Sequence, residues 1–256
     1  MYVWFDALNI YRSGVEEKGQ DWWPADLHVI GKGILRFHAI YWPAFLLSAG
    51  LALPKTILVH EYLTIDGQKM SKSVGNIIDP VDIIKKYGAD GLRYYFLAHI
   101  SPFADGDFSE EKLKDAYNAD LANGLGNLIA RVAKLCENAT FAQSLSKEKK
   151  SSHILDTGDY SEAISEYKFN DALAFVWEKI RKLDKFINDE KPWELQKNNS
   201  PAGGQKLRAV LAHAVDQINE IAALLEPFLP ETAEKIESQF TKPQIKSEAS
   251  LFPRIS

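Results

Sequence analysis

A short lysine-containing segment is the part of the sequence best suited to chemistry. It reads Lys69-Met70-Ser71-Lys72-Ser73 and follows the turn-forming pair Asp66-Gly67. Two ammonium groups on a loop after a strand can neutralise the charge that develops when the bond between the α- and β-phosphates of a nucleotide breaks. The small hydroxyl side chains let the backbone approach a polyphosphate closely. The segment therefore predicts a phosphate-binding loop, whereas a generic Lys-x-x-Lys pair is more often a solvated basic turn.

A second group of side chains is suited to a polarizable ligand. Trp4 and Tyr11 lie near the start of the sequence, and Ile34 and His38 are four residues apart, which places them on one face of a helix near its N-terminus. Aromatic edges with one or two polar tips can contact a polarizable group well. The alternative is ordinary core packing for the two aromatic residues and a satisfied core histidine for His38.

Two predicted strands and a helix must position these groups. Residues 27–31 predict a buried strand, residues 34–50 an apolar helix that Pro43 kinks and Gly50 ends, and residues 55–65 a second strand. The order of strand, turn, helix and strand is typical of a doubly wound α/β sheet.

The rest of the sequence predicts helices. Asp79 is a suitable N-cap ahead of Pro80. Apolar residues then recur in alternating steps of four and three over three stretches, 121–135, 169–187 and 211–225. We therefore expect an antiparallel helix bundle.

Polar composition predicts two loops inside this helical half, at residues 143–152 and 197–206. Neither has the character of a domain boundary. We place that boundary near residue 110, between an α/β part and the helices.

The composition limits the kinds of site that the chain can hold. Of the 256 residues 46% are hydrophobic, enough for a globular core. The net charge is -5, whereas proteins that bind nucleic acid usually carry a basic surface, so any RNA contact must be local. Cys136 is the single cysteine, which excludes an intramolecular disulfide and a cysteine-rich zinc site. We expect its side chain to be buried on a helix. The sequence shows no signal peptide and no uncharged stretch long enough to cross a membrane, so we expect a soluble cytoplasmic protein.

Several separate segments resemble methionyl-tRNA synthetases, which are class I aminoacyl-tRNA synthetases. The lysine-containing segment matches the KMSKS signature of that class, and its flanks match at YVWFDAL (2–8), HVIGKGILRFHAIYWPAFL (28–46), VHEYLT (59–64), DGLRYYFL (90–97) and KPWEL (191–195). The resemblance implies an α/β fold in two domains. Residues 1–110 would form the second half of a Rossmann-like catalytic domain plus a connecting region, and residues 111–256 an all-α anticodon-binding bundle.

The resemblance also implies the activity and its site residues. The activity is ATP-dependent conversion of methionine to methionyl-adenylate and transfer of the methionyl group to methionine tRNA. The implied ATP-binding residues are Gly31, Val59, Lys69, Met70, Ser71, Lys72 and Ser73, of which Lys69 and Lys72 are catalytic. The resemblance implies that Mg²⁺ accompanies ATP, and we expect this chain to hold no zinc. The implied methionine-binding residues are Trp4, Ala7, Leu8, Tyr11, Ile34 and His38. The implied anticodon-binding residues are Asn127, Arg131 and Trp193, whose amide, guanidinium and indole can bond or stack on unpaired bases.

The sequence departs from the family's pattern in three respects. Gly33 stands where an acidic residue is common, Glu61 stands where a glycine is common, and no HIGH-type motif occurs. The chain therefore looks truncated, and we expect little or no adenylate formation by it alone. Two alternatives remain, a catalytically silent tRNA-binding fragment and another class I synthetase or related nucleotidyl transferase. The sequence does not specify the oligomeric state.

Overall fold

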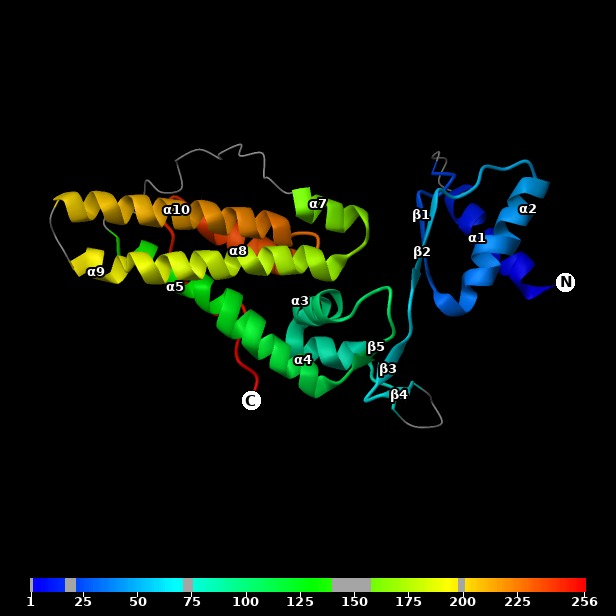
Figure 1. Ribbon diagram of the computed structural model, residues 1–256, viewed down its shortest axis with the longest axis horizontal. Helices are drawn as coiled ribbons and strands as arrows, with labels where there is room; N and C mark the ends of the chain where they lie inside the picture. The colour runs from blue at the N-terminus through cyan, green and yellow to red at the C-terminus, as the bar shows by residue number, and fades with distance from the viewer. Residues whose placement is uncertain (1, 17–21, 71–75, 140–157, 198–200) are drawn as a thin grey trace. The chain divides into compact units, whose positions relative to one another are not determined.

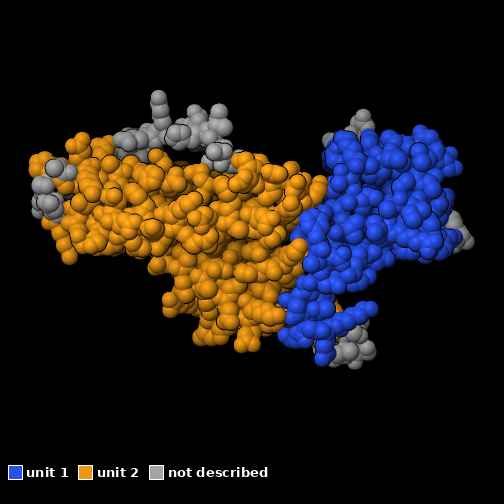
Figure 2. Space-filling view, viewed as in Figure 1, with its two compact units in different colours: residues 1–69, 102–107 blue, residues 70–101, 108–256 orange. Residues whose placement is uncertain are grey.

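Two compact units make up the chain. The computed structural model describes residues 2–16, 22–70, 76–139, 158–197 and 201–256 (Figure 1). Unit 1 comprises residues 1–69 with 102–107, and unit 2 comprises residues 70–101 with 108–256 (Figure 2).

Unit 1 is built on two parallel strands, β1 (Leu27–Gly31) and β2 (Thr56–His60), as the alternation of helix and strand predicted. Helices α1 (Val3–Glu16) and α2 (Trp42–Ser48) lie on the same side of these strands (Figure 1). Between β1 and α2 the chain forms a 3₁₀ turn, η1 (Lys32–Ile34), and a π-helical turn, η2 (Phe37–Tyr41).

The predicted helix over residues 34–50 is only partly right. Pro43 lies in the first turn of α2, directly after the π-helical turn η2, and its nitrogen cannot donate to a carbonyl of that turn. The irregularity comes one turn earlier, in η2. Gly50, with φ of 68°, follows the end of α2 as predicted.

The single strand predicted over residues 55–65 is wrong. It is two strands, because β2 ends at His60 and β3 (Leu63–Ile65) belongs to a second sheet, in the order β4-β3-β5, with β4 (Gln68–Lys69) and β5 (Gly106–Phe108). The backbone leaves β2 here because Glu61 N–H donates to the Pro102 carbonyl at 3.0 Å and Tyr62 N–H donates to Asp105 at 2.8 Å. These partners come from a distant segment, so periodicity in the sequence could not indicate them.

Unit 2 is helical, as the apolar periodicity predicted. Its elements are α3 (Pro80–His99), α4 (Glu110–Ala116), the π-helix η3 (Tyr117–Gly126), α5 (Asn127–Glu137), α7 (Gly158–Ser165), α8 (Phe169–Glu190), α9 (Pro192–Lys197), α10 (Pro201–Leu225) and α11 (Pro230–Phe240). Asp79 caps α3 by accepting from Val81 N–H at 2.8 Å, and Cys136 is buried on α5, both as expected.

The apolar stripes of the helical half form its core. Leu125, Ile187 and Leu211 have no exposed side-chain surface, although they come from three different predicted stretches. The loop predicted at 197–206 is wrong from Pro201 onward, because α10 begins there, with a proline whose fixed φ suits the first helical turn. The loop predicted at 143–152 lies outside the described residues. None of the helices in the described ranges has the length and apolar content needed to cross a membrane.

Candidate functional site

Tyr11 of α1 and His38 of η2, both predicted to bind methionine, are in direct contact. The Tyr11 hydroxyl lies 2.8 Å from His38 Nε2, and His38 Nδ1 lies 2.9 Å from the Ile34 carbonyl oxygen. A carbonyl only accepts, so Nδ1 carries the proton, and in the neutral ring Nε2 accepts from the Tyr11 hydroxyl. The four-residue spacing of Ile34 and His38 thus fixes the imidazole, which in turn orients Tyr11.

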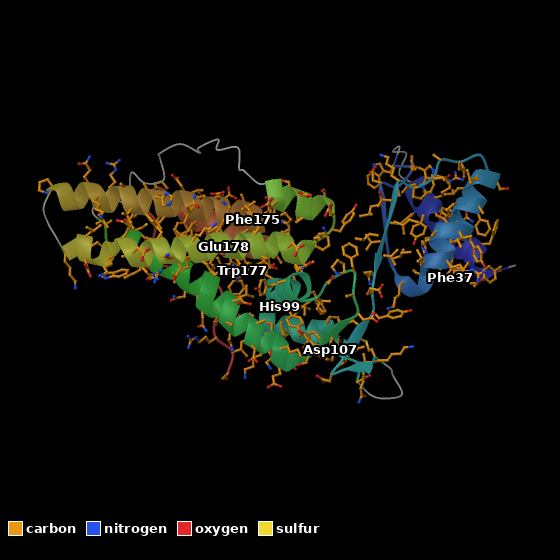
Figure 3. The ribbon with its side chains drawn as sticks, viewed as in Figure 1. Phe37, His99, Asp107, Phe175, Trp177 and Glu178 are labelled. Carbon is orange, nitrogen blue, oxygen red and sulfur yellow. The ribbon has the colours of Figure 1, made fainter. Side chains whose placement is uncertain are left out.

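Trp4 forms one wall of this site. Its indole stacks on Phe37, which Figure 3 labels, with ring centroids 4.1 Å apart, and the ring of His38 lies 6.2 Å from the indole. Tyr11 and Trp4 are both partly buried against a small core that includes Leu8. Aromatic faces with one hydroxyl tip make a surface suited to a polarizable, weakly polar side chain.

Ala7 and Leu8 differ in exposure. Leu8 is 1% exposed and packs with Trp42 and Leu46, so its described contacts are those of a core residue. Ala7 is exposed on α1. The structure therefore brings Trp4, Tyr11, Ile34 and His38 together and leaves Ala7 and Leu8 beside Trp4 and Tyr11 on α1.

His28 belongs to this cluster but was missed by the sequence analysis. Its ring lies 4.4 Å from Tyr11 and 6.1 Å from His38, and its side chain is 5% exposed. Within the described ranges its Nε2 has no hydrogen-bond partner. Burial, and secondarily the charge of His38, lower the pKa of His28. The available signal was strand alternation, which places His28 and Ile30 on one face of β1.

The described residues implied for ATP lie at two places, the carboxyl ends of β1 and β2 in unit 1 and the segment Lys69–Met70, where unit 2 begins. Gly31 ends β1 opposite His60 at the end of β2, and Val59 precedes it in β2. The carboxyl ends of parallel strands are where open α/β sheets bind ligands. Lys69 lies on β4, paired with Thr64 of β3, and is exposed, as is Met70, while Ser71, Lys72 and Ser73 lie outside the described residues.

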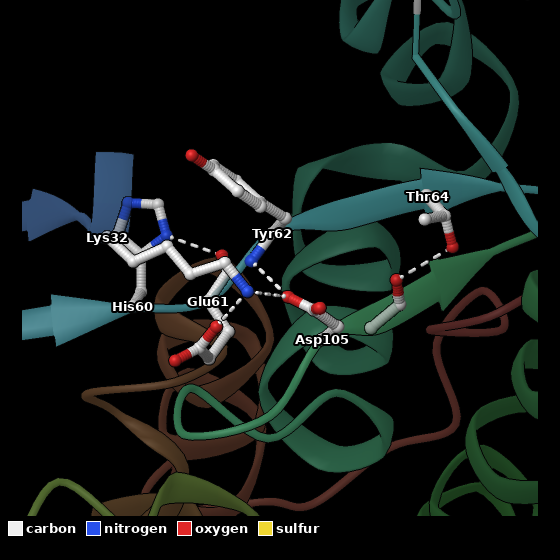
Figure 4. Close-up of polar contacts among 7 residues, drawn as sticks. Lys32, His60, Glu61, Tyr62, Thr64 and Asp105 are labelled. Atoms are coloured by element: carbon white, nitrogen blue, oxygen red, sulfur yellow. Dashed lines mark hydrogen bonds and ion pairs between the residues drawn. The ribbon is translucent and has the colours of Figure 1, made fainter. Parts of the chain in front are cut away.

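Lys32 links the carboxyl ends of these strands to a distant segment. Its ammonium forms ion pairs with Glu61 and with Asp105, the latter at 2.6 Å, and Asp105 also accepts from Tyr62 N–H (Figure 4). The bond to Asp105 first, and then the one to Glu61, raise the pKa of Lys32, and the same contact lowers the pKa of Asp105. Glu61, a departure noted in the sequence, thus has a partner in Lys32.

In unit 2, Asn127 and Arg131 lie four residues apart on α5. Asn127 is exposed beside a hollow of about 440 Å³ that Asn123 and Arg254 also line. Arg131 donates to Asp184 at 2.6 Å and to Asn188 at 3.0 Å, so α8 holds its guanidinium in place.

Trp193 is half-buried on the short helix α9. The Gln196 amide of the same helix donates to the Leu135 carbonyl of α5 at 2.7 Å. A left-handed residue, Lys191 with φ of 46°, makes the turn from α8 into α9. The two helices that carry the three predicted anticodon residues are therefore joined directly.

The described part of the chain holds no preformed metal site. Across residues 2–16, 22–70, 76–139, 158–197 and 201–256, no three histidine, cysteine, aspartate or glutamate side chains are grouped so that they could hold a metal ion.

Comparison with known proteins gives one consistent family. A profile described as tRNA synthetases class I (M) matches residues 1–133. The methionine-tRNA ligase of Thermotoga maritima is 41% identical over 249 residues, which cover 92% of this chain and 39% of the relative. That of Nostoc sp. is 41% identical over 259 residues, covering 93% of this chain and 48% of the relative.

Solved structures agree. The free form of Mycobacterium tuberculosis methionyl-tRNA synthetase superposes with a TM-score of 0.81 at 29% identity, covering 100% of this chain and 56% of that one. The same enzyme in complex with methionyl-adenylate gives a TM-score of 0.78 at 33% identity, covering 55% of its chain. The chain thus spans about two fifths to a half of the length of the curated relatives named here.

Proposed function

Since this chain belongs to the class I tRNA synthetases (M), we propose that it is a part of a methionine-tRNA ligase that supplies the methionine pocket, the KMSKS loop and the anticodon-binding helices. The observation that carries the proposal is the hydrogen-bonded Tyr11–His38 pair beside the Trp4 indole. It provides a polar tip between aromatic faces, and the KMSKS loop follows in the same chain.

The reaction of the whole ligase proceeds in two steps. The methionine carboxylate attacks the α-phosphorus of ATP, the bond to the bridging oxygen breaks, and pyrophosphate leaves. The acyl group of the adenylate then passes to a hydroxyl of the terminal ribose of tRNA, and AMP leaves. The role of this chain is to bind and orient methionine and to place Lys69 and Lys72 near the developing negative charge. Mg²⁺ would accompany ATP as its counter-ion.

Selectivity for methionine would rest on the geometry of Tyr11. The His38 imidazole, fixed by the Ile34 carbonyl, accepts a hydrogen bond from the Tyr11 hydroxyl, and this bond directs the lone pairs of the hydroxyl oxygen. Trp4 adds a flat apolar wall. A thioether gains dispersion contacts from such walls that a shorter or branched side chain cannot make fully.

The helical domain, residues 111–256, would bind tRNA, and residues 1–110 would hold the catalytic half and the connecting region. Asn127 is exposed, and Trp193 presents a half-buried indole on a helix tied to α5. Stacking of a base on such an indole contributes about 1 to 3 kcal/mol, which lets an acidic chain bind RNA locally. We propose a cytoplasmic location for it, where tRNA is charged.

The test is methionine-dependent exchange of pyrophosphate into ATP. It compares the 256-residue chain alone with a longer form to which a relative's preceding half of the catalytic domain is joined. Exchange in the longer form only, with methionine and not with cysteine or valine, supports the proposal. Exchange driven by another amino acid contradicts it. Anticodon-dependent tRNA binding without exchange in either form would favour the alternative of a silent tRNA-binding fragment.

A further inference from the structure

The hydroxyl of Tyr62 occupies the space that a side chain at Gly33 would need. A Cβ atom built on Gly33 would lie 2.6 Å from the Tyr62 hydroxyl oxygen, closer than real Cβ contacts, but 3.6 Å from the ring carbon that bears it. The oxygen atom alone is therefore in conflict with a larger residue at this position. Gly33 and Tyr62 form a reciprocal pair, in which the loop after β2 supplies a polar tip where the turn after β1 has no side chain.

This hydroxyl lies in the region where a nucleotide is expected. Gly33 follows the end of β1 by two residues, and Tyr62 follows the end of β2 by two residues. Both strands run parallel, so the hydroxyl sits beyond their carboxyl ends, the ligand-binding edge of such sheets. Tyr62 is 53% exposed, and in the part of the chain that the structure describes its hydroxyl makes no hydrogen bond. It remains available to a ligand.

The phenol is held in place from its other side. The Lys32 ammonium lies 4.5 Å from the centre of the ring, and Tyr62 N–H donates to Asp105 at 2.8 Å. Figure 4 shows the hydroxyl pointing away from the carboxylates of Glu61 and Asp105. Cation and ring attract each other here, which fixes the direction of the tip without occupying it.

Local charge decides which part of a nucleotide the hydroxyl would meet. Lys32 is the cation of this cluster, and it is paired with both Glu61 and Asp105, so the cluster carries an excess of negative charge. Phosphate oxygens would be repelled by that excess, whereas a neutral sugar would not. A phenol both donates and accepts, as a ribose hydroxyl does.

We propose that Tyr62 is a nucleotide-binding residue that hydrogen-bonds a ribose hydroxyl of ATP in place of a side chain at position 33. The inference rests on the proposed function, because it takes ATP as the ligand. It assigns to Tyr62 a role that depends on Gly33.

The experiment titrates the 256-residue chain with adenosine, 2′-deoxyadenosine and 3′-deoxyadenosine by ligand-observed NMR. Tyr62→Phe should lower the affinity for adenosine about twofold to tenfold, the range expected for the loss of one neutral hydrogen bond. It should leave unchanged the affinity for the deoxy analogue that lacks the bonded hydroxyl. Equal losses for all three nucleosides, or no loss for adenosine, would overturn the assignment.

Gly33→Ala provides the matched control. In the presence of Tyr62 its methyl group must displace the hydroxyl, so we expect a loss of adenosine affinity similar to that of Tyr62→Phe. In the Tyr62→Phe background the nearest ring carbon is 3.6 Å away, and the alanine should cause no further loss. Additive losses would contradict the reciprocal pair.

Pyrophosphate exchange separates this inference from the proposed function. Methionine-dependent exchange in the longer form, together with unaltered adenosine binding by Tyr62→Phe, overturns the role of Tyr62 alone. Absence of both exchange and adenosine binding in the unsubstituted protein overturns both.

Discussion

The two units bury their apolar residues very differently. In unit 1, Val3, Ile10 and Val29 are 68%, 66% and 61% exposed, and the fully buried core around Leu8 is small. In unit 2 the apolar stripes of α5, α8 and α10 are almost completely buried. The helical unit satisfies its own hydrophobic surface, whereas unit 1 does not.

The reason lies in the kind of structure that each unit contains. Helices with one apolar stripe close a core by packing on one another. Parallel strands, in contrast, are normally covered on both faces, and here Val29 leaves one face of β1 exposed. Unit 2 should therefore be a stable folding unit, and unit 1 should be the less stable of the two.

The largest expected effect tests the stability of the bundle. Leu211→Ala removes a side chain with no exposed surface from α10, and it should lower the free energy of unfolding by about 2 to 5 kcal/mol because a cavity remains. Val29→Thr, at an exposed position of unit 1, should change it by less than about 0.5 kcal/mol. Urea unfolding followed by circular dichroism measures both. Similar changes for the two variants would remove the distinction between the units.

Binding of tRNA should depend on unit 2 alone. Trp193→Ala should weaken the binding of methionine tRNA by about 1 to 3 kcal/mol, since a stacking surface for a base is lost. Tyr11→Phe serves as the control in unit 1 and should leave tRNA affinity unchanged. Filter binding at fixed salt, with an anticodon-substituted tRNA alongside, measures the effect. If Trp193→Ala weakens both tRNAs equally, Trp193 does not contact the anticodon.

Methionine binding should depend on unit 1 alone. Tyr11→Phe removes the 2.8 Å hydrogen bond to His38 and should weaken the binding of methionine by about 0.5 to 1.5 kcal/mol. Trp193→Ala is the reciprocal control and should have no effect. The readout is the methionine concentration at half-maximal pyrophosphate exchange in the longer form. An unchanged value for Tyr11→Phe would show that the pair does not orient the ligand.

The smallest effect concerns pH. Burial lowers the pKa of His28 below its value in the unfolded chain, so the unfolded state binds protons more readily as the pH falls. The contribution of neutral His28 to the stability of unit 1 is present above the ordinary histidine pKa and is lost as the pH falls below it. Unfolding followed by tryptophan fluorescence at about pH 7.5 and about pH 5.5 should show this loss. His28→Gln should have a smaller pH dependence, and an equal one would contradict the account.

What the sequence could predict follows the range of the interactions involved. The N-cap at Asp79, the burial of Cys136 and the three apolar stripes depend on neighbours within a few residues, and all are confirmed. The break between β2 and β3 depends on Pro102 and Asp105, some forty residues later in the chain, and it was missed.

The same distinction applies to the candidate site. The contact of His38 with Ile34 follows from helical spacing. The resemblance implied only that His38 and Tyr11 both bind methionine, and their hydrogen bond across 27 residues was not predicted. His28 was missed because strand alternation gives a face but no partner. The pairing of Gly33 with Tyr62 could not be seen either, since a glycine in a sequence does not show what fills its space.

Hydrogen exchange of the 256-residue chain most directly tests the claim that methionine and ATP bind to the first part of the chain and that the anticodon binds to the helices of unit 2. Amide protection would be mapped after adding methionine with a nonhydrolysable ATP analogue, and separately after adding methionine tRNA. We predict that the small molecules protect segments of residues 1–73 and that tRNA protects α5 and α9 in an anticodon-dependent manner. Protection of the helical unit by methionine, or of α1 and η2 by the anticodon, would contradict the account.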